Sequence, residues 1–235
     1  MKSKITIAID GFSSTGKSTI AKQLAKHLGY IYVDTGAMYR AIAFFAMQKG
    51  FISPEHFDVK ALIRSLPTIN LQFEYKPDLG FAVMMLNGLD IEKEIRTIEV
   101  SQYVSKIAEI NEVRTKLVEQ QQFTGKDKGI VMDGRDIGTV VFPEAELKLF
   151  ITASPTIRAQ RRFDELIKKG DQVSYAEVYK NVVERDSIDT QRTHSPLVKA
   201  LDAIEIDNSD LSKDEQFEKI MALTQQALSF VLKKK

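Results

Sequence analysis

Nine residues near the start of the chain, Gly11 to Thr19, read GFSSTGKST and lie between a strand-like apolar run and a helix-like run. They match the pattern G-x-x-x-x-G-K-[ST], whose glycines let several backbone N–H groups turn toward a phosphate. Lys17 would reach the terminal phosphates, the helix would present its positive end, and Ser18 would hold Mg²⁺. A chance glycine turn is the alternative. The matched positions in this context favour a site for a nucleoside triphosphate with Mg²⁺.

A second candidate site lies in DTGAMYR, where an apolar strand ends and a helix begins. Asp34, Thr35 and Gly36 would start the helix, and Arg40 would follow about one turn along it. Ligands of doubly wound sheets gather at the carboxyl ends of the strands. A phosphate acceptor is expected here.

A third candidate lies in MDGRDIGTVVFP, where Asp133 and Asp136 bracket Gly134 and Arg135. A simple turn would explain this composition, since Asp and Gly are common turn residues. Asp133, however, closes the apolar run GIVM, and carboxylates at such positions reach the magnesium shell in phosphate-loop proteins. We therefore favour a functional role for this segment.

Arginines are concentrated in two later segments, IRAQRRF and ERDSIDTQR, and others lie near strand ends. Planar guanidinium groups bind phosphate with two parallel hydrogen bonds and stabilise the charge of a transferring phosphoryl group. Solvation of an exposed helix face is the alternative for any one of them. The arginines concerned are Arg40, Arg96, Arg114, Arg135, Arg158, Arg161, Arg162, Arg185 and Arg192.

Two classes of protein use such a phosphate loop: nucleotide-driven switches and small kinases. Guanine-nucleotide switches generally carry Asp-x-x-Gly and Asn-Lys-x-Asp signatures, and neither occurs here. A kinase needs a second anion site and a cover that excludes water. The arginines and the polar strand ends favour the kinase, and an ATP-dependent switch remains the second class.

The composition of the chain bears on which partners and which cellular compartment are expected. The chain has 235 residues, 43% of them hydrophobic, and a formal net charge of +1, so no nucleic-acid or membrane surface is indicated. It has no cysteine, and its three histidines are far apart. No apolar run reaches the roughly 18 residues of a membrane span. We expect a cytoplasmic protein in a reducing compartment.

Short β-rich runs alternate with amphipathic helical runs, which is typical of a parallel sheet flanked by helices. Five core strands are expected, in KITIAID, YIYVD, GIVMD, LKLFITA and AIEID. A helix is expected from Lys17 to Leu28, another near Pro54 to Ser65, and a last one from about Lys213. Asn87-Gly88 predicts a hairpin within a small antiparallel insert at about 68–91.

Taken together, these segments resemble the bacterial cytidylate kinases, a family of phosphate-loop nucleoside monophosphate kinases, over nearly the whole chain. GFSSTGKST, DTGAMYR, EIRT, VSKIAEINEVR, DGRDIGTVVFP, RAQRR and ERDSIDTQR with SPL follow in the family's order. The resemblance implies transfer of the γ-phosphoryl group of ATP to CMP or dCMP, with Mg²⁺ as cofactor. A uridylate or adenylate kinase of the same fold is the runner-up, and a monomer is expected.

The resemblance also implies one kinase unit over residues 1–235 and a set of site residues. The core would comprise 1–36, 125–155 and 195–235, the monophosphate-binding region 37–124, and an arginine-rich helical lid with flanking helices 156–192. ATP would contact Gly11, Ser13, Ser14, Thr15, Gly16, Lys17, Ser18 and Thr19, with Mg²⁺ at Ser18 and, through water, Asp133. CMP would contact Thr35, Arg40, Ser105, Arg114, Arg135, Asp136, Arg185, Asp189 and Arg192. The catalytic groups would be Lys17, Arg135, Arg158 and Arg162.

Three positions depart from the family's pattern. Phe12 stands where Pro is usual, Thr15 replaces a smaller residue, and Ile188 falls where some relatives have Arg. The first two bear on the stiffness of the phosphate loop and the third on ribose contacts. None removes a group that the chemistry needs.

Overall fold

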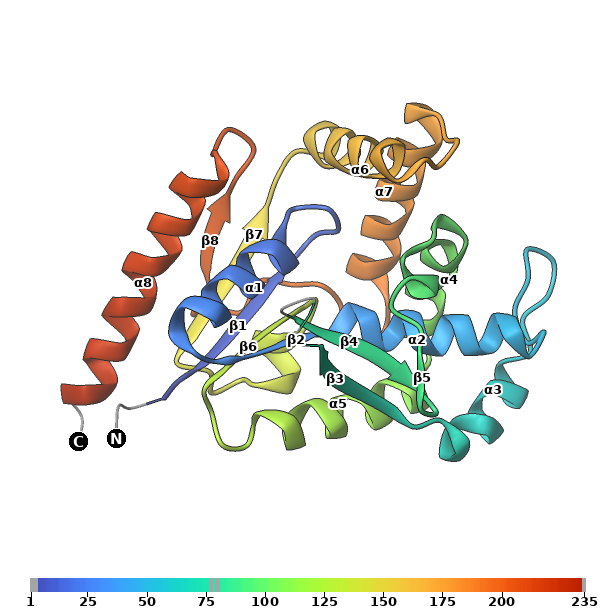
Figure 1. The fold of residues 1–235 in the computed structure, drawn as a ribbon, viewed down its shortest axis with the longest axis horizontal. Helices are drawn as coiled ribbons and strands as arrows, with labels where there is room; N and C mark the ends of the chain where they lie inside the picture. The colour runs from blue at the N-terminus through green and yellow to red at the C-terminus, as the bar shows by residue number, and fades with distance from the viewer. Residues whose placement is uncertain (1–3, 77, 79–80, 234–235) are drawn as a thin grey trace. The chain divides into compact units, whose positions relative to one another are not determined.

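The computed structural model describes residues 4–76, 78 and 81–233 (Figure 1). The chain divides into two compact units. The first unit is built from the chain up to Val33 and from Thr124 onward, and the second comprises Asp34–Phe123. Each unit has its own hydrophobic core.

The first unit contains a five-stranded parallel sheet with strand order β2-β6-β1-β7-β8, so the predicted fold class is confirmed. The strands are β1 (Thr6–Gly11), β2 (Ile31–Asp34), β6 (Ile130–Gly134), β7 (Leu147–Thr152) and β8 (Ile204–Asp207). The helices are α1 (Lys17–Leu28), α6 (Pro155–Lys169), α7 (Tyr175–Gln191) and α8 (Lys213–Lys233). The central strand β1 leads directly into the phosphate loop and α1 (Figure 1).

The core of this unit explains why β1 holds the loop firmly. Every residue of β1 is buried, and its isoleucines pack with apolar side chains of α1, β7 and α8. At the end of the strand, Gly11 lies so close to β7 that a Cβ there would stand 2.0 Å from the carbonyl oxygen of Ile151. No other residue fits this position, which brings the start of the loop against the neighbouring strand.

The second unit combines helices with a three-stranded antiparallel sheet of order β3-β4-β5, which confirms the predicted insert. Its strands are β3 (Leu71–Lys76), β4 (Phe81–Leu86) and β5 (Leu89–Asp90). Its helices are α2 (Thr35–Gln48), α3 (Val59–Ser65), α4 (Ile98–Ala108) and α5 (Asn111–Gly125), with short 3-10 turns η1 (Leu66–Thr68) and η2 (Glu94–Arg96); α5 ends in the first unit. The hairpin turn has positive φ at both Asn87 (50°) and Gly88 (83°), the geometry that an Asn-Gly pair favours.

One predicted boundary was wrong. The helix expected from Pro54 begins at Val59, because the Asp58 side chain accepts a hydrogen bond from the backbone N–H of Ala61 and caps α3 there. Ile52 and Phe57 instead pair across an isolated antiparallel bridge. In the described part of the chain, no helix is both long and apolar enough to cross a membrane.

Candidate nucleotide-binding site

The phosphate loop is held through its carbonyl oxygens. The Phe12 carbonyl accepts hydrogen bonds from Lys17 Nζ (2.5 Å) and Thr15 Oγ1 (3.1 Å). The Ser13 carbonyl accepts one from Arg158 Nη1 at 3.3 Å. Because the C=O and N–H of a trans peptide point in opposite directions, each of these bonds fixes the direction of the N–H group in the same peptide. Peptides of fixed orientation are what a phosphate-binding loop requires.

Lys17 is 4% exposed and sits among charged groups. Burial and the nearby charge of Arg135 lower the pKa of Lys17 well below its usual value, and Asp133, Asp10 and Asp189 oppose this effect. A polyphosphate bound in the loop would place further negative charge beside Lys17 and favour its protonated form. The site is therefore electrostatically suited to an anion of high charge.

Ser18 and Asp133 lie together, as expected for a magnesium site. Ser18 Oγ donates to Asp133 Oδ2 (2.8 Å), and the Tyr32 hydroxyl donates to Asp133 Oδ1 (2.8 Å). Among the described residues, no group of three or more His, Asp or Glu forms a metal cage. Mg²⁺ does not require one, because it binds one or two protein oxygens together with substrate phosphates and water. The Ser18 hydroxyl and the Asp133 carboxylate are oxygen ligands of the kind that Mg²⁺ binds.

Asp10, which the sequence analysis did not select, fixes the loop after Asp136. Its carboxylate accepts hydrogen bonds from the backbone N–H groups of Ile137 (2.8 Å) and Gly138 (2.7 Å) at the start of the π-helical turn η3 (Ile137–Val141). Burial raises the pKa of Asp10 to about 7, against the effect of these two hydrogen bonds. Asp10 ends an apolar strand-like run, as Asp133 does, and this position in the sequence could have identified it as a candidate site residue. Asp10 thereby joins the phosphate-loop strand to the Asp136 segment.

Arg135, Arg185 and Arg192 surround one carboxylate, that of Asp189. Arg135 Nε donates to Asp189 Oδ2 at 2.8 Å, and Arg192 Nη1 lies 4.0 Å from Asp189 Oδ1. Burial would raise the pKa of Asp189, but the charges of the three arginines lower it below its usual value. Burial would lower the pKa of Arg135, but Asp133 and Asp186 also act on it and, with Asp189, raise its pKa. The three arginines are thus gathered at one place, where their guanidinium groups could bind a phosphate.

Arg158 and Arg162 lie on α6 in different surroundings. Arg158 is 2% exposed, pairs through both terminal nitrogens with Asp186 (3.0 and 2.5 Å), and donates from Nε to the Ala153 carbonyl. Its guanidinium carbon lies 5.1 Å from the centre of the Phe12 ring, so Phe12 contributes a cation–π contact. Arg162 instead pairs with Glu165 at 3.0 Å. Arg158 therefore contacts the phosphate loop at Phe12 and Ser13.

Four of the predicted CMP contacts belong to the second unit. Thr35 begins α2, and its neighbour Arg40 pairs with Asp34 at 3.0 Å. Ser105 is buried on α4. Arg114, on α5, donates to the Ala108 carbonyl and stands over a tyrosine ring. All four are buried or half-buried polar side chains rather than solvated surface groups.

Asp34 is the organising carboxylate of this second group. It caps α2 by accepting from the Ala37 N–H (2.9 Å) and pairs with both Arg40 and Arg96, the latter at 2.8 Å. Arg96 in turn pairs with Glu92 at 2.6 Å. Burial would raise the pKa of Asp34, but the charges of Arg40 and Arg96 lower it well below its usual value. Arg96 lies 62 positions from Asp34, so no local sequence pattern indicated this contact.

Asp34→Asn is expected to lower the free energy of unfolding by about 2 kcal/mol at pH 6, because half-buried Arg40 and Arg96 each lose an ion pair with the buried Asp34, although Arg96 keeps its pair with Glu92. A carboxyl whose folded pKa is depressed adds stability above its unfolded pKa of about 4, and that stability is lost as the pH falls through the folded value. The difference in the free energy of unfolding between wild type and Asp34→Asn, measured by urea unfolding, should therefore be smaller at pH 3 than at pH 6.

Asp58→Asn is the matched control, because Asp58 caps α3 and makes no ion pair among the described residues. Its effect should be smaller at pH 6. If Asp34→Asn lowered the free energy of unfolding equally at pH 6 and pH 3, the result would contradict the assigned ion pairs.

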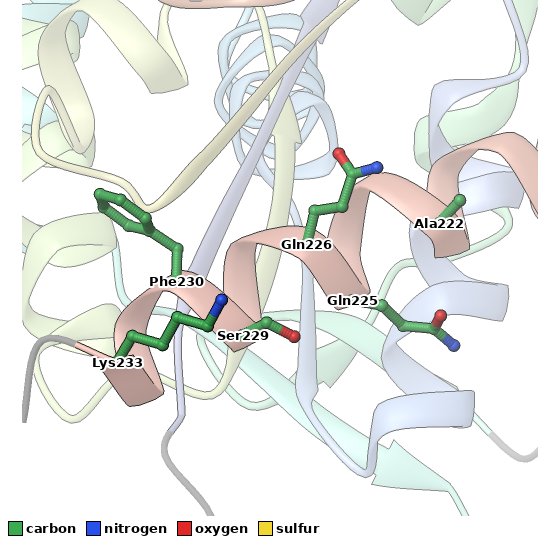
Figure 2. A pocket seen from close by; sticks show the side chains of 6 residues that line it. All are labelled: Ala222, Gln225, Gln226, Ser229, Phe230 and Lys233. Carbon is green, nitrogen blue, oxygen red and sulfur yellow. The ribbon is translucent and has the colours of Figure 1, made fainter.

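A hollow on α8 contains none of the predicted site residues. Figure 2 shows its lining, and Gln225, Gln226 and Ser229 present their polar groups there. The remaining lining residues are Ala222, Phe230 and Lys233. The hollow is therefore separate from the residues that form the phosphate loop.

The fold and these residues define a phosphate-loop nucleotide-binding protein, and comparison with known proteins specifies its family. The family model described as cytidylate kinase matches residues 7–226. A cytidylate kinase of Flavobacterium johnsoniae is 70% identical over 220 residues, which cover 94% of this chain and 96% of that protein. One of Bacteroides fragilis is 53% identical over 225 residues, covering 96% and 98%. The chain belongs to the cytidylate kinase family.

Solved structures resemble the chain less closely. A shikimate kinase from Bacteroides thetaiotaomicron is 10% identical with a TM-score of 0.45, covering 97% of this chain and 99% of that one.

Proposed function

We propose that the protein transfers the γ-phosphoryl group of ATP to CMP or dCMP, giving CDP or dCDP and ADP. The observation that carries the proposal is membership of the cytidylate kinase family over residues 7–226. The hydrogen bond between Ser18 and Asp133 also supports it. Family membership also favours a kinase over an ATP-dependent switch.

The phosphate loop, Gly11–Thr19, binds ATP in this proposal. Its N–H groups bind the phosphates, and Lys17 neutralises the β- and γ-phosphates. Ser18 would hold Mg²⁺ directly, and Asp133, which accepts the Ser18 hydroxyl hydrogen bond, would hold it through water. When bound, Mg²⁺ supplies charge neutralisation between the phosphates.

CMP is the proposed acceptor. Arg40, Arg135 and Arg192 would bind its phosphate, and Arg185 and Asp189 would bind its ribose. Asp136, Ser105 and Arg114 bind the cytosine, with Thr35 nearby. A carboxylate accepting from the exocyclic amine of cytosine would face the carbonyl of uracil acceptor to acceptor, and this mismatch disfavours UMP.

The chemistry needs positioning more than acid–base catalysis. The phosphate of CMP is anionic at neutral pH, so no general base is assigned. Arg40, Arg135 and Arg192 hold it in line with the γ-phosphate, while Arg158 and Arg162 stabilise the charge of the transferring group. Closure of the helical lid that carries α6 would exclude water, which otherwise competes for the phosphoryl group.

Turnover of ATP with and without CMP tests this proposal. We expect ADP release to rise by at least about a hundredfold when CMP is added, because water is a poor competitor in a site built for an anionic acceptor. ADP release at the same rate in both conditions would overturn the kinase and favour an ATPase switch. We propose further that the enzyme acts as a monomer in the cytoplasm, with no nucleic-acid or membrane partner.

A further inference from the structure

Asn208, the residue after β8, is 1% exposed and is hydrogen-bonded through both its side chain and its backbone. Its Nδ2 donates to the carbonyl of Thr15 (2.7 Å) and to Gln216 Oε1 (3.2 Å). Its Oδ1 and its backbone carbonyl accept from Arg161 Nη1 (2.9 Å) and Nη2 (2.8 Å), and its backbone N–H donates to the Thr152 carbonyl (2.9 Å). Both ends of the amide are engaged, so its orientation is determined.

The bond to Thr15 bears directly on the phosphate loop. The Thr15 carbonyl and the Gly16 N–H belong to one trans peptide, so holding the carbonyl on the Asn208 side turns the Gly16 N–H away from Asn208. Gly16, at one end of this peptide, has a φ of 87°, and Ser14, the residue before Thr15, has a φ of 58°. A loop with such dihedral angles needs outside contacts to select one orientation of each peptide.

Asn208 also connects the loop to α6. Arg161, its partner on α6, lies one helical turn from Arg158, which donates to the Ser13 carbonyl. The helix therefore contacts the loop backbone at Ser13 directly and at Thr15 through Asn208. These two contacts act on alternate peptides of the loop.

We propose that Asn208 is a positioning residue for the donor phosphates: it sets the direction of the Gly16 N–H and, through Arg161, couples the loop to α6. This inference rests on the proposed function, because it takes the loop to be the ATP site. Its expected signature is weaker binding of the donor nucleotide with little change toward the acceptor.

The test measures the dissociation constant of ADP by calorimetry in the absence of CMP, and then KM for ATP and for CMP. Asn208→Ala should raise the ADP dissociation constant and KM for ATP by about tenfold or more, with KM for CMP within about twofold. Gln216→Leu is the matched control, because it removes the other partner of Nδ2 and leaves the Thr15 bond. It should leave ADP binding within about twofold.

Asn208→Asp guards against a variant that fails to fold. It keeps the acceptor for Arg161 but turns an oxygen toward the Thr15 carbonyl, so ADP binding should weaken at least as much as in the alanine variant. Wild-type ADP binding in either folded variant would overturn the inference, as would an equal loss in Gln216→Leu. If the wild-type protein bound ADP but did not phosphorylate CMP, the proposed function would be overturned and the inference about Asn208 would not, because ADP binding is measured separately.

Discussion

Lys17→Ala is expected to lower kcat for CMP phosphorylation by about a thousandfold, because removing one preorganised group that stabilises transition-state charge costs about that much. Lys17 Nζ donates a hydrogen bond to the Phe12 carbonyl of the loop. The free energy of unfolding should fall little, because burial lowers the pKa of Lys17 and makes its charged form costly in the folded protein. Initial rates with saturating ATP and CMP, together with urea unfolding, measure both effects.

Two further variants make this test specific. Lys26→Ala removes an exposed lysine from the last turn of the same helix and should leave kcat unchanged. Lys17→Arg keeps a positive charge but not its compact shape, so it should recover only part of the rate. A folded Lys17→Ala enzyme within about tenfold of wild type would contradict the role given to this lysine.

Asp136→Ala is expected to lower kcat/KM for CMP by about a hundredfold or more while KM for ATP stays within about threefold. The reason is that a site built to accept a hydrogen bond from the substrate leaves that substrate's donor unpaired when the acceptor is removed. Asp136 is 4% exposed, and its backbone carbonyl accepts from Val140 and Val141, so the segment keeps its course without the side chain.

Asp136→Asn sharpens the same test. An amide presents a donor as well as an acceptor, so the ratio of kcat/KM for UMP to that for CMP should rise. Asp127→Ala, in the exposed turn before β6, is the control. It should change neither kcat/KM for CMP nor the ratio of kcat/KM for UMP to that for CMP. Equal losses toward CMP and ATP in Asp136→Ala would show that this residue supports the fold rather than the base.

Much of the fold was predictable because its signals are local. The strand, loop and first helix follow from GFSSTGKST and its flanking apolar runs, and α1 spans Lys17–Leu28 as predicted. The Asn87-Gly88 hairpin follows from the φ values that this pair tolerates. The family prediction is also confirmed, by the match over residues 7–226. The start of α3 was missed because Asp58, rather than Pro54, provides the cap.

The residues that support the site were harder to predict, because their partners are distant in the chain. Asp10 bonds Ile137 across 127 positions, and Asn208 bonds Thr15 across 193. No local pattern links such residues, and only the packing of β1, β6 and β8 into one parallel sheet brings them together. Arg96 likewise meets Asp34 across 62 positions. The reacting groups were therefore easier to find than the residues that orient them.

The most direct test of the central claim is a comparison of phosphoryl acceptors for the purified wild-type enzyme with ATP and Mg²⁺. The nucleoside diphosphates formed from CMP, dCMP, UMP and AMP are separated and quantified at equal acceptor concentrations. We expect CDP and dCDP to form with kcat/KM at least about a hundredfold above that for UMP or AMP. A higher kcat/KM for UMP or AMP than for CMP would contradict the account.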